Sequence, residues 1–407
     1  MDIKPQVFRV GDFKGAVEPF IREDLSTENK LQLDELIQGI YKEVVTQISA
    51  SRGIDYSELR NTSDKMLVRN AKLAKEYGLI DSLVYEDEMK DELRNRLGLE
   101  TDEEIPFIKY SKYKKTVSFY KNSPNEIAVI VAEGTILPGE SDQGVVGAET
   151  IIDELTKARL NKKVKAVVLR INSPGGAFQS ADQMWREIVL TGQEKPVIAS
   201  MGDYAASGGY YLAMACDTII ARPTTITGSI GVFSVLFDLS GFMGNKLGLT
   251  SEHVQTGEVG DMITLTRSLT DLEKSIWQKQ TDEIYETFTG KAATGRNMSQ
   301  ADIKKVASGR VWTGTQGAEK GLVDNLGGFN DAVLAAAYKA GIDDYRLRYY
   351  PKQKTYIEKL MGTLEESAKV RILQWEMGEF YPAYNQWKQI KSYQGTQARI
   401  PVDFEIH

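Results

Sequence analysis

The chain has 407 residues, a length that predicts two or three domains rather than one. A hydrophobic fraction of 42% with a charged fraction of 26% is enough for a sizeable core and argues against global disorder. The net charge of −7 argues against a nucleic-acid-binding protein, because such proteins usually carry a basic face.

Helical patterns dominate the first part of the chain, residues 1–110. The segment Leu25-Ser26-Thr27-Glu28 has the pattern of a helix cap and precedes a predicted helix over 30–50. A second helix is predicted over about 87–97. Residues 111–125 are polar and basic, and we interpret them as a linker.

From Glu126 onward, apolar runs rich in valine and isoleucine alternate with helical patterns. This order predicts parallel βαβ units in a sheet that is covered on both faces. We therefore predict a complete α/β domain over 126–345 and an aromatic, amphipathic tail over 346–407, which is expected to pack on a neighbour rather than on a cofactor. The predicted strands are 127–132, 164–171, 196–201 and 218–221, and the predicted helices are 149–160, 180–190, 208–216, 282–291 and 331–340.

An internal repeat links the two ends of the chain. Residues 76–83 (EYGLIDSL) match residues 319–326 (EKGLVDNL), and Ile40-Tyr41 matches Ile284-Tyr285. The repeat predicts that residues 1–97 are the back half of a unit whose complete copy lies at roughly 126–340. We accordingly expect either a fragment or an intact protein that starts further upstream.

The counts of histidine and cysteine limit the possible chemistry. The chain has only His253, His407 and Cys216, which are too few for a Cys/His zinc site, and no metal or cofactor is expected. A cysteine nucleophile would have to be Cys216, and either this nucleophile or a Ser-His-Asp triad would need His253. His253 lies among polar residues at a strand-like position and is interpreted as a surface or strand histidine. If the chain is an enzyme, its base is not expected to be an imidazole.

Two turns rich in small residues follow predicted strands. Asn172-Ser173-Pro174-Gly175-Gly176 follows the strand over 164–171, where open α/β sheets bind ligands. Its backbone N–H groups form either an oxyanion hole or only a tight turn. Asp203–Tyr211 places Ser207 where a strand gives way to a helix, as an accessible nucleophile or as a helix N-cap.

Two further segments gain meaning from the repeat. Thr227-Gly228-Ser229-Ile230-Gly231 is by itself a β-turn pattern, and Lys14 by itself is an ordinary surface lysine. Aligning 10–14 on 256–260 puts Gly260 at the position of Lys14. The complete unit therefore has the serine, whereas the partial unit has the lysine.

Together, four segments resemble the signal peptide peptidase A family, membrane-bound bacterial serine proteases with a Clp/crotonase-like fold. Asn172–Gly176 is similar to the family's oxyanion segment, and Asp203–Tyr211 is similar to its nucleophile segment. Thr227–Val232 resembles the segment whose serine holds the catalytic lysine, and Val7–Phe20 resembles the lysine segment of the long, two-repeat form.

The resemblance implies a role for each matching residue. Ser207 would be the nucleophile and Lys14 the general base, with Ser229 orienting the lysine amine. Gly176 and Gly208 would supply the oxyanion N–H groups. A lysine acts as a base only when its pKa is lowered, so we expect Lys14 to be buried against the sheet domain.

The resemblance also implies partners and a location. The substrates would be released signal peptides and other apolar, extended peptides, and the assembly would be a homo-oligomer, a tetramer in the long form. The intact protein is expected at the bacterial inner membrane, on its periplasmic side. No apolar run of this chain reaches the roughly 18 residues that span a bilayer, so the chain itself is expected to be soluble.

Three alternatives remain open at this point. A crotonase-type acyl-CoA enzyme would share the fold and the Gly-Gly turn without needing Ser207 or Lys14. A Clp-like cytosolic protease would need a histidine about 25 residues after the serine, where Val232 and its neighbours offer none. A catalytically silent assembly module would fit a chain that lacks the front half of the first repeat.

Overall fold

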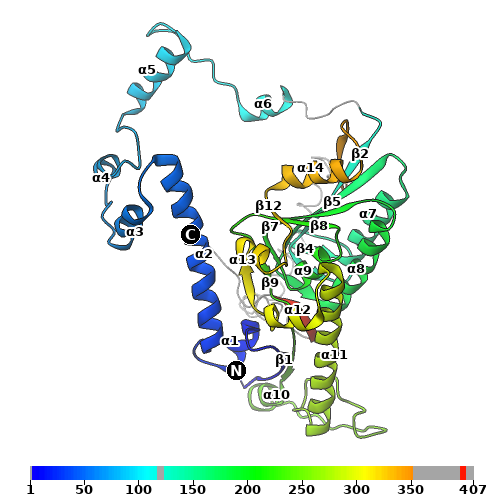
Figure 1. Cartoon of the computed structure of the whole chain (residues 1–407). Helices are drawn as coiled ribbons and strands as arrows, with labels where there is room; N and C mark the ends of the chain where they lie inside the picture. The colour runs from blue at the N-terminus through cyan, green and yellow to red at the C-terminus, as the bar shows by residue number, and fades with distance from the viewer. Residues whose placement is uncertain (1, 117–122, 352–394, 400–407) are drawn as a thin grey trace. The chain divides into compact units, whose positions relative to one another are not determined.

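The computed structural model describes residues 2–116, 123–351 and 395–399 (Figure 1). The chain forms two compact units. One combines residues 1–36 with 122–407, and the other is formed by 37–121. The lysine segment thus belongs to the same compact unit as the α/β domain.

An eight-stranded sheet forms the centre of the larger unit (Figure 1). Its middle strands are β2 (Glu126–Glu133), β5 (Val164–Ser173) and β7 (Val197–Ala206), and they pair in parallel. The outer strands are β13 (Arg346–Tyr350), β8 (Thr218–Ala221), β9 (Ile226–Gly228), β11 (Val311–Thr313) and β12 (Asn325–Leu326). The parallel order confirms the predicted βαβ units.

Both faces of this sheet are buried, which explains the continuous apolar runs. Successive side chains of a strand point to opposite faces. Ala128 and Ile130 lie in one hydrophobic cluster with α7 (Ala148–Leu160), α8 (Phe178–Gly192) and α9 (Gly208–Ala213). Ile127 and Val129 lie in a second cluster with α14 (Phe329–Lys339).

A second, six-stranded sheet lies at the carboxyl end of this core. Its order is β1 (Lys4–Val10), β10 (Val232–Asp238), β14 (Gly395–Arg399), β6 (Gly175–Ala177), β3 (Thr135–Leu137) and β4 (Val145–Gly147). Neither β1 nor β14 was predicted. The mainly helical prediction for the first 110 residues is wrong for residues 4–10, because β1 pairs along its whole length with β10.

The remaining helices follow the predicted order. The short turn η1 (Gly15–Val17) and α1 (Glu18–Ile21) connect β1 to α2 (Thr27–Arg52), which is longer than the predicted 30–50. The others are α3 (Tyr56–Asp64), α4 (Ala71–Glu76), α5 (Glu86–Leu97), α6 (Tyr110–Thr116), α10 (Ser240–Leu247), α11 (Asp271–Arg296), α12 (Gln300–Val306) and α13 (Gly314–Glu319). Within the described residues, no helix is both long and apolar enough to cross a bilayer.

The internal repeat is visible as repeated hydrogen bonds. Arg52 donates to the Gly78 carbonyl at 2.8 Å, and Arg296 donates to the Gly321 carbonyl at 2.9 Å. Each arginine also pairs with the aspartate three residues further on, Asp81 or Asp324. The two copies therefore have the same helix-turn geometry in different compact units.

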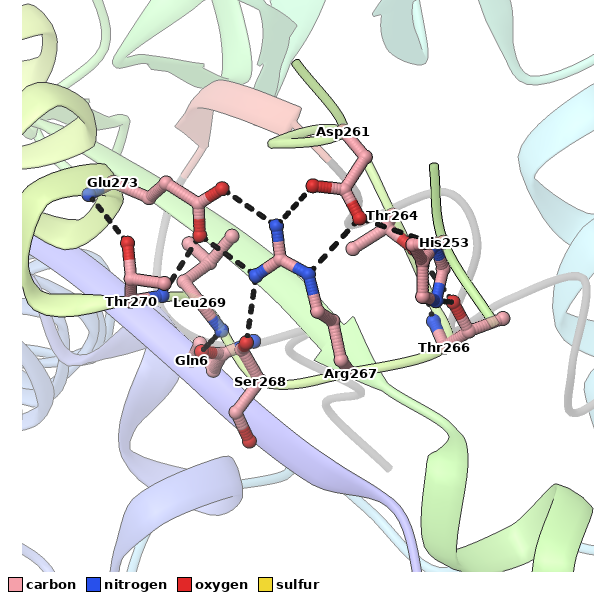
Figure 2. Close-up of polar contacts among 10 residues, drawn as sticks. All are labelled: Gln6, His253, Asp261, Thr264, Thr266, Arg267, Ser268, Leu269, Thr270 and Glu273. Carbon is pink, nitrogen blue, oxygen red and sulfur yellow. Dashed lines mark hydrogen bonds and ion pairs between the residues drawn. The ribbon is translucent and has the colours of Figure 1, made fainter. Parts of the chain in front are cut away.

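An arginine cluster holds the irregular segment between α10 and α11. Figure 2 shows Arg267 between the carboxylates of Asp261 and Glu273, and Arg267 Nη1 donates to Glu273 Oε2 at 2.8 Å. Hydrogen bonds from Arg267 and from the Thr270 amide lower the pKa of Glu273 to about 2. His253, which lies in no strand, contacts Asp261 from the same segment (Figure 2).

Candidate active site

Ser207 lies at a sharp turn from β7 into α9. Its backbone has φ 54° and ψ −114°, a conformation that non-glycine residues rarely adopt. The Ser207 amide donates to the Gly228 carbonyl at 2.8 Å, which anchors the turn to β9. Although Ser207 occupies the N-cap position, its side chain makes no capping hydrogen bond. Its hydroxyl is bonded to Lys14 instead.

Lys14 reaches this turn from the segment between β1 and η1. It is fully buried, and its Nζ donates to Ser207 Oγ at 2.9 Å. The same Nζ donates to Ser229 Oγ at 3.0 Å and to the Ser229 carbonyl at 3.2 Å. The structure therefore brings together the three residues that the sequence singled out as nucleophile, base and orienting serine.

The environment of Lys14 favours a neutral amine. Burial lowers the pKa of Lys14 well below 10.5, because an ammonium loses its hydration there. Among the described residues, no carboxylate lies within ion-pair distance of Nζ to offset this desolvation. A neutral amine beside a serine hydroxyl can accept its proton, which is the arrangement of an activated nucleophile.

Ser229 is held by the loop that precedes β11. Its amide donates to the Arg310 carbonyl at 2.7 Å, and its hydroxyl donates to the Gly309 carbonyl at 3.2 Å. Gly309 also packs on the backbone of Lys14, so that a Cβ there would lie 2.8 Å from the lysine amide nitrogen. Gly309 was not singled out from the sequence, although Ser308-Gly309 is a recognisable turn signal.

The predicted oxyanion glycines lie next to each other. A Cβ on Gly208 would lie 3.2 Å from the Gly176 nitrogen, so the two amides come from adjacent backbone. The strand β14 passes the same place, where Ala398 pairs with Gly176. A Cβ on Gly175, which has φ +100°, would lie 1.9 Å from the Ala398 carbonyl oxygen. Only a glycine allows a peptide strand to approach this closely.

The other candidate groups lie elsewhere. His253 Nε2 bonds to Thr266 Oγ1 at 2.9 Å, as Figure 2 shows, and Cys216 is buried with its thiol directed at the Leu212 carbonyl. Burial raises the pKa of Cys216, so its thiol is not poised as a nucleophile. Among the described residues, no group of three or more His, Cys, Asp or Glu side chains is placed to hold a metal ion.

The predicted tail is only partly described. Tyr349 and Tyr350 belong to β13, which pairs with β2. The other tail aromatics named by the prediction, between 356 and 387, lie outside the described residues. The C-terminal strand β14 at the site was missed, because its five residues carry no periodic signal and their partners are far away in sequence.

Comparison with known proteins identifies the chain's relatives. A chloroplastic serine protease SPPA of Arabidopsis thaliana is 38% identical over 348 residues, which cover 84% of this chain and 51% of that protein. Protease 4 of Salmonella typhi is 33% identical over 382 residues, which cover 91% of this chain and 61% of that protein. The chain thus spans about half to three-fifths of the length of these curated relatives.

Structural similarity to a solved protein is weak. A ClpP1 mutant from Listeria monocytogenes matches 50% of this chain at 15% identity with a TM-score of 0.34, which covers 94% of that protein and carries no argument. The model of peptidase family S49 matches residues 1–100 and 190–343, more than half of the chain. With this match the predicted fold class, an α/β Clp/crotonase-like domain with mainly helical flanking segments, is confirmed. The chain belongs to peptidase family S49.

Proposed function

We propose that the chain carries the active site of a serine endopeptidase that uses a Ser-Lys dyad. The observation that supports this most strongly is the 2.9 Å hydrogen bond between Lys14 Nζ and Ser207 Oγ in a fully buried setting. The lowered pKa of Lys14 supplies a base without an imidazole.

In the proposed mechanism, Ser207 Oγ attacks a peptide carbonyl while its proton passes to Lys14 Nζ. The N–H groups of Gly176 and Gly208 stabilise the oxyanion that forms. The C–N bond then breaks, and Lys14 gives the proton to the leaving amine. Water hydrolyses the acyl-enzyme in the second half of the reaction, with Lys14 taking the proton of the water. Ser229 holds the amine in line throughout.

Strand β14 suggests how a substrate lies. It pairs antiparallel with β6 on one side and with β10 on the other, and its Ala398 side chain is fully buried. An extended peptide added between two strands gains main-chain hydrogen bonds whatever its sequence. This geometry supports extended peptides with small, apolar side chains as substrates. Together with the resemblance of the four segments, it leads us to propose released signal peptides.

Further proposals concern the whole protein. We propose a homo-oligomer, a tetramer as in the long form of the family, located on the periplasmic side of the bacterial inner membrane. We also propose four functional parts: a back half of a first repeat at 1–110 that carries Lys14, a linker at 111–125, the protease domain at 126–345 and a tail at 346–407.

Peptide cleavage by single variants tests the proposed function. We expect Ser207→Ala and Lys14→Ala each to lower kcat by about 10⁴-fold or more, because members of a catalytic unit fail together. Equal cleavage by wild type and either variant would refute the dyad and would favour a silent assembly module. A fluorophosphonate that labels Ser207 supports the peptidase, whereas turnover that needs CoA would favour the acyl-CoA alternative.

A further inference from the structure

One buried glutamine contacts both segments that hold the proposed base. Gln32 lies on α2 and is 1% exposed. Its Nε2 donates to the Phe13 carbonyl at 2.9 Å, and its Oε1 accepts from the Val311 amide at 3.2 Å. Phe13 directly precedes Lys14, and Val311 begins β11. This side chain therefore joins the lysine segment to the strand beside Ser229.

The contact with Phe13 acts on the backbone turn that aims the lysine. Lys14 has φ −78° and ψ 71°, and the Gly15 amide donates to the Phe13 carbonyl at 2.8 Å. These values define an inverse γ-turn with Lys14 as its central residue. The Phe13 carbonyl thus accepts two hydrogen bonds, one that closes the turn and one from Gln32. A change at Gln32 alters the orientation of this carbonyl and of the peptide that carries Lys14.

The contact with Val311 acts on the other side of Lys14. The carbonyl of the preceding residue, Arg310, accepts from the Ser229 amide, and the carbonyl of Gly309 accepts from the Ser229 hydroxyl. The position of Ser229 relative to Lys14 therefore depends on the position of this loop. Gln32 sets the spacing between the loop and the lysine turn through one amide group.

A buried polar network fixes which way this amide points. Gln32 Nε2 also donates to Asn29 Oδ1 at 2.8 Å, and Asn29 Nδ2 donates to Glu18 Oε2 at 2.8 Å. Glu18 also accepts from the amide and hydroxyl of Ser26. Asn29 and Glu18 are each 2% exposed. Because a carboxylate without its proton only accepts, it orients Asn29, and Asn29 in turn orients Gln32.

We propose that Gln32 is a positioning residue for the Ser207–Lys14 pair, acting through Lys14 rather than on substrate. This inference rests on the proposed function. A misplacement of about 1 Å in a reacting group can cost about 100-fold in rate. Loss of the Gln32 bridge is therefore expected to slow the reaction of Ser207 without changing how the substrate binds.

The test measures the rate at which a fluorophosphonate labels Ser207 in the full chain. We expect Gln32→Leu to lower this rate about 10- to 100-fold. Gln32→Glu keeps the shape of the side chain but has no N–H to donate, so the same direction is expected and the test does not depend on one variant folding. The matched control is Gln47→Leu, the same change at an exposed position of α2 that should leave the rate within about twofold.

The decisive comparison repeats Gln32→Leu in a Lys14→Met background at high pH, where residual labelling is measured. A residue that acts through Lys14 should have almost no further effect once Lys14 is gone, a non-additivity of coupled sites. An equal loss in both backgrounds would overturn the inference and show a general structural role, as would no loss at all. Failure of wild type to label at Ser207 would instead refute the proposed function.

Discussion

At the scale of single residues, the burial of Lys14 has a consequence for the pH dependence of activity. The neutral amine is the active base, and the pKa of Lys14 is lowered well below 10.5 by desolvation. We therefore expect kcat/KM to rise with pH through an acidic limb that lies well below pH 10.5. A pH–rate profile on a peptide substrate measures this limb, and an acidic limb near 10.5 would show that Lys14 is not desolvated in the working enzyme.

The same lysine should make stability depend on pH. Between the lowered pKa of Lys14 and 10.5, the unfolded chain binds a proton at this lysine that the folded chain does not bind. The free energy of unfolding should therefore rise with pH across this window. In Lys14→Met this contribution disappears, so the curve should be flatter. Urea unfolding at several pH values checks the slope, and equal slopes in the two proteins would contradict the prediction.

Residue types predicted part of the site but not its supporting contacts. Ser207 and Lys14 stood out through strand-end turns and the repeat, since small residues around a serine are uncommon outside tight turns. Gln32 carried no such signal, because a glutamine in a helix is most often a solvated surface residue. Its importance arises from burial against Phe13 and Val311, which only the tertiary structure supplies.

At the scale of elements, β14 occupies the place that we assign to an extended substrate. Replacing residues 395–399 with a Gly-Ser segment of equal length should remove a tethered competitor. Because tethered segments have effective concentrations in the millimolar range, we expect KM for a peptide substrate to fall about tenfold or more, with kcat little changed. Steady-state kinetics measure both constants.

The control for this experiment is the same replacement in Ser207→Ala, which should remain inactive. If the replacement leaves KM unchanged or raises it, β14 is a structural strand of the second sheet and does not compete with substrate.

Elements with local signals were predicted, whereas elements that depend on distant partners were not. The strands β2, β5, β7 and β8 match the predictions closely because their apolar runs are buried on both faces. β1 is a strand only because it pairs with β10, more than 200 residues further along the chain. Such non-local pairing contributes no periodicity that a sequence window can detect.

At the scale of the whole molecule, the two copies of the repeat should differ in stability. The side chain of Arg296 is 7% exposed, and its partner Asp324 also accepts from the Ile219 amide of β8 at 2.7 Å. The side chain of Arg52 is 27% exposed and pairs with Asp81, which is 90% exposed. We expect Arg296→Ala to cost about 1.5–3 kcal/mol and Arg52→Ala at most about 1 kcal/mol.

Native-state hydrogen exchange, read separately for 126–345 and for 37–116, measures these losses in each part. Equal losses for the two variants would show that the shared contacts, rather than the burial around them, determine stability.

The central claim is that Lys14 activates Ser207, and the pH dependence of fluorophosphonate labelling at Ser207 tests it most directly. The account predicts that the wild-type labelling rate rises through a titration well below pH 10.5, and that Lys14→Met abolishes both the titration and most of the rate. A wild-type titration that persists unchanged in Lys14→Met would contradict the account, because another group would then be the base.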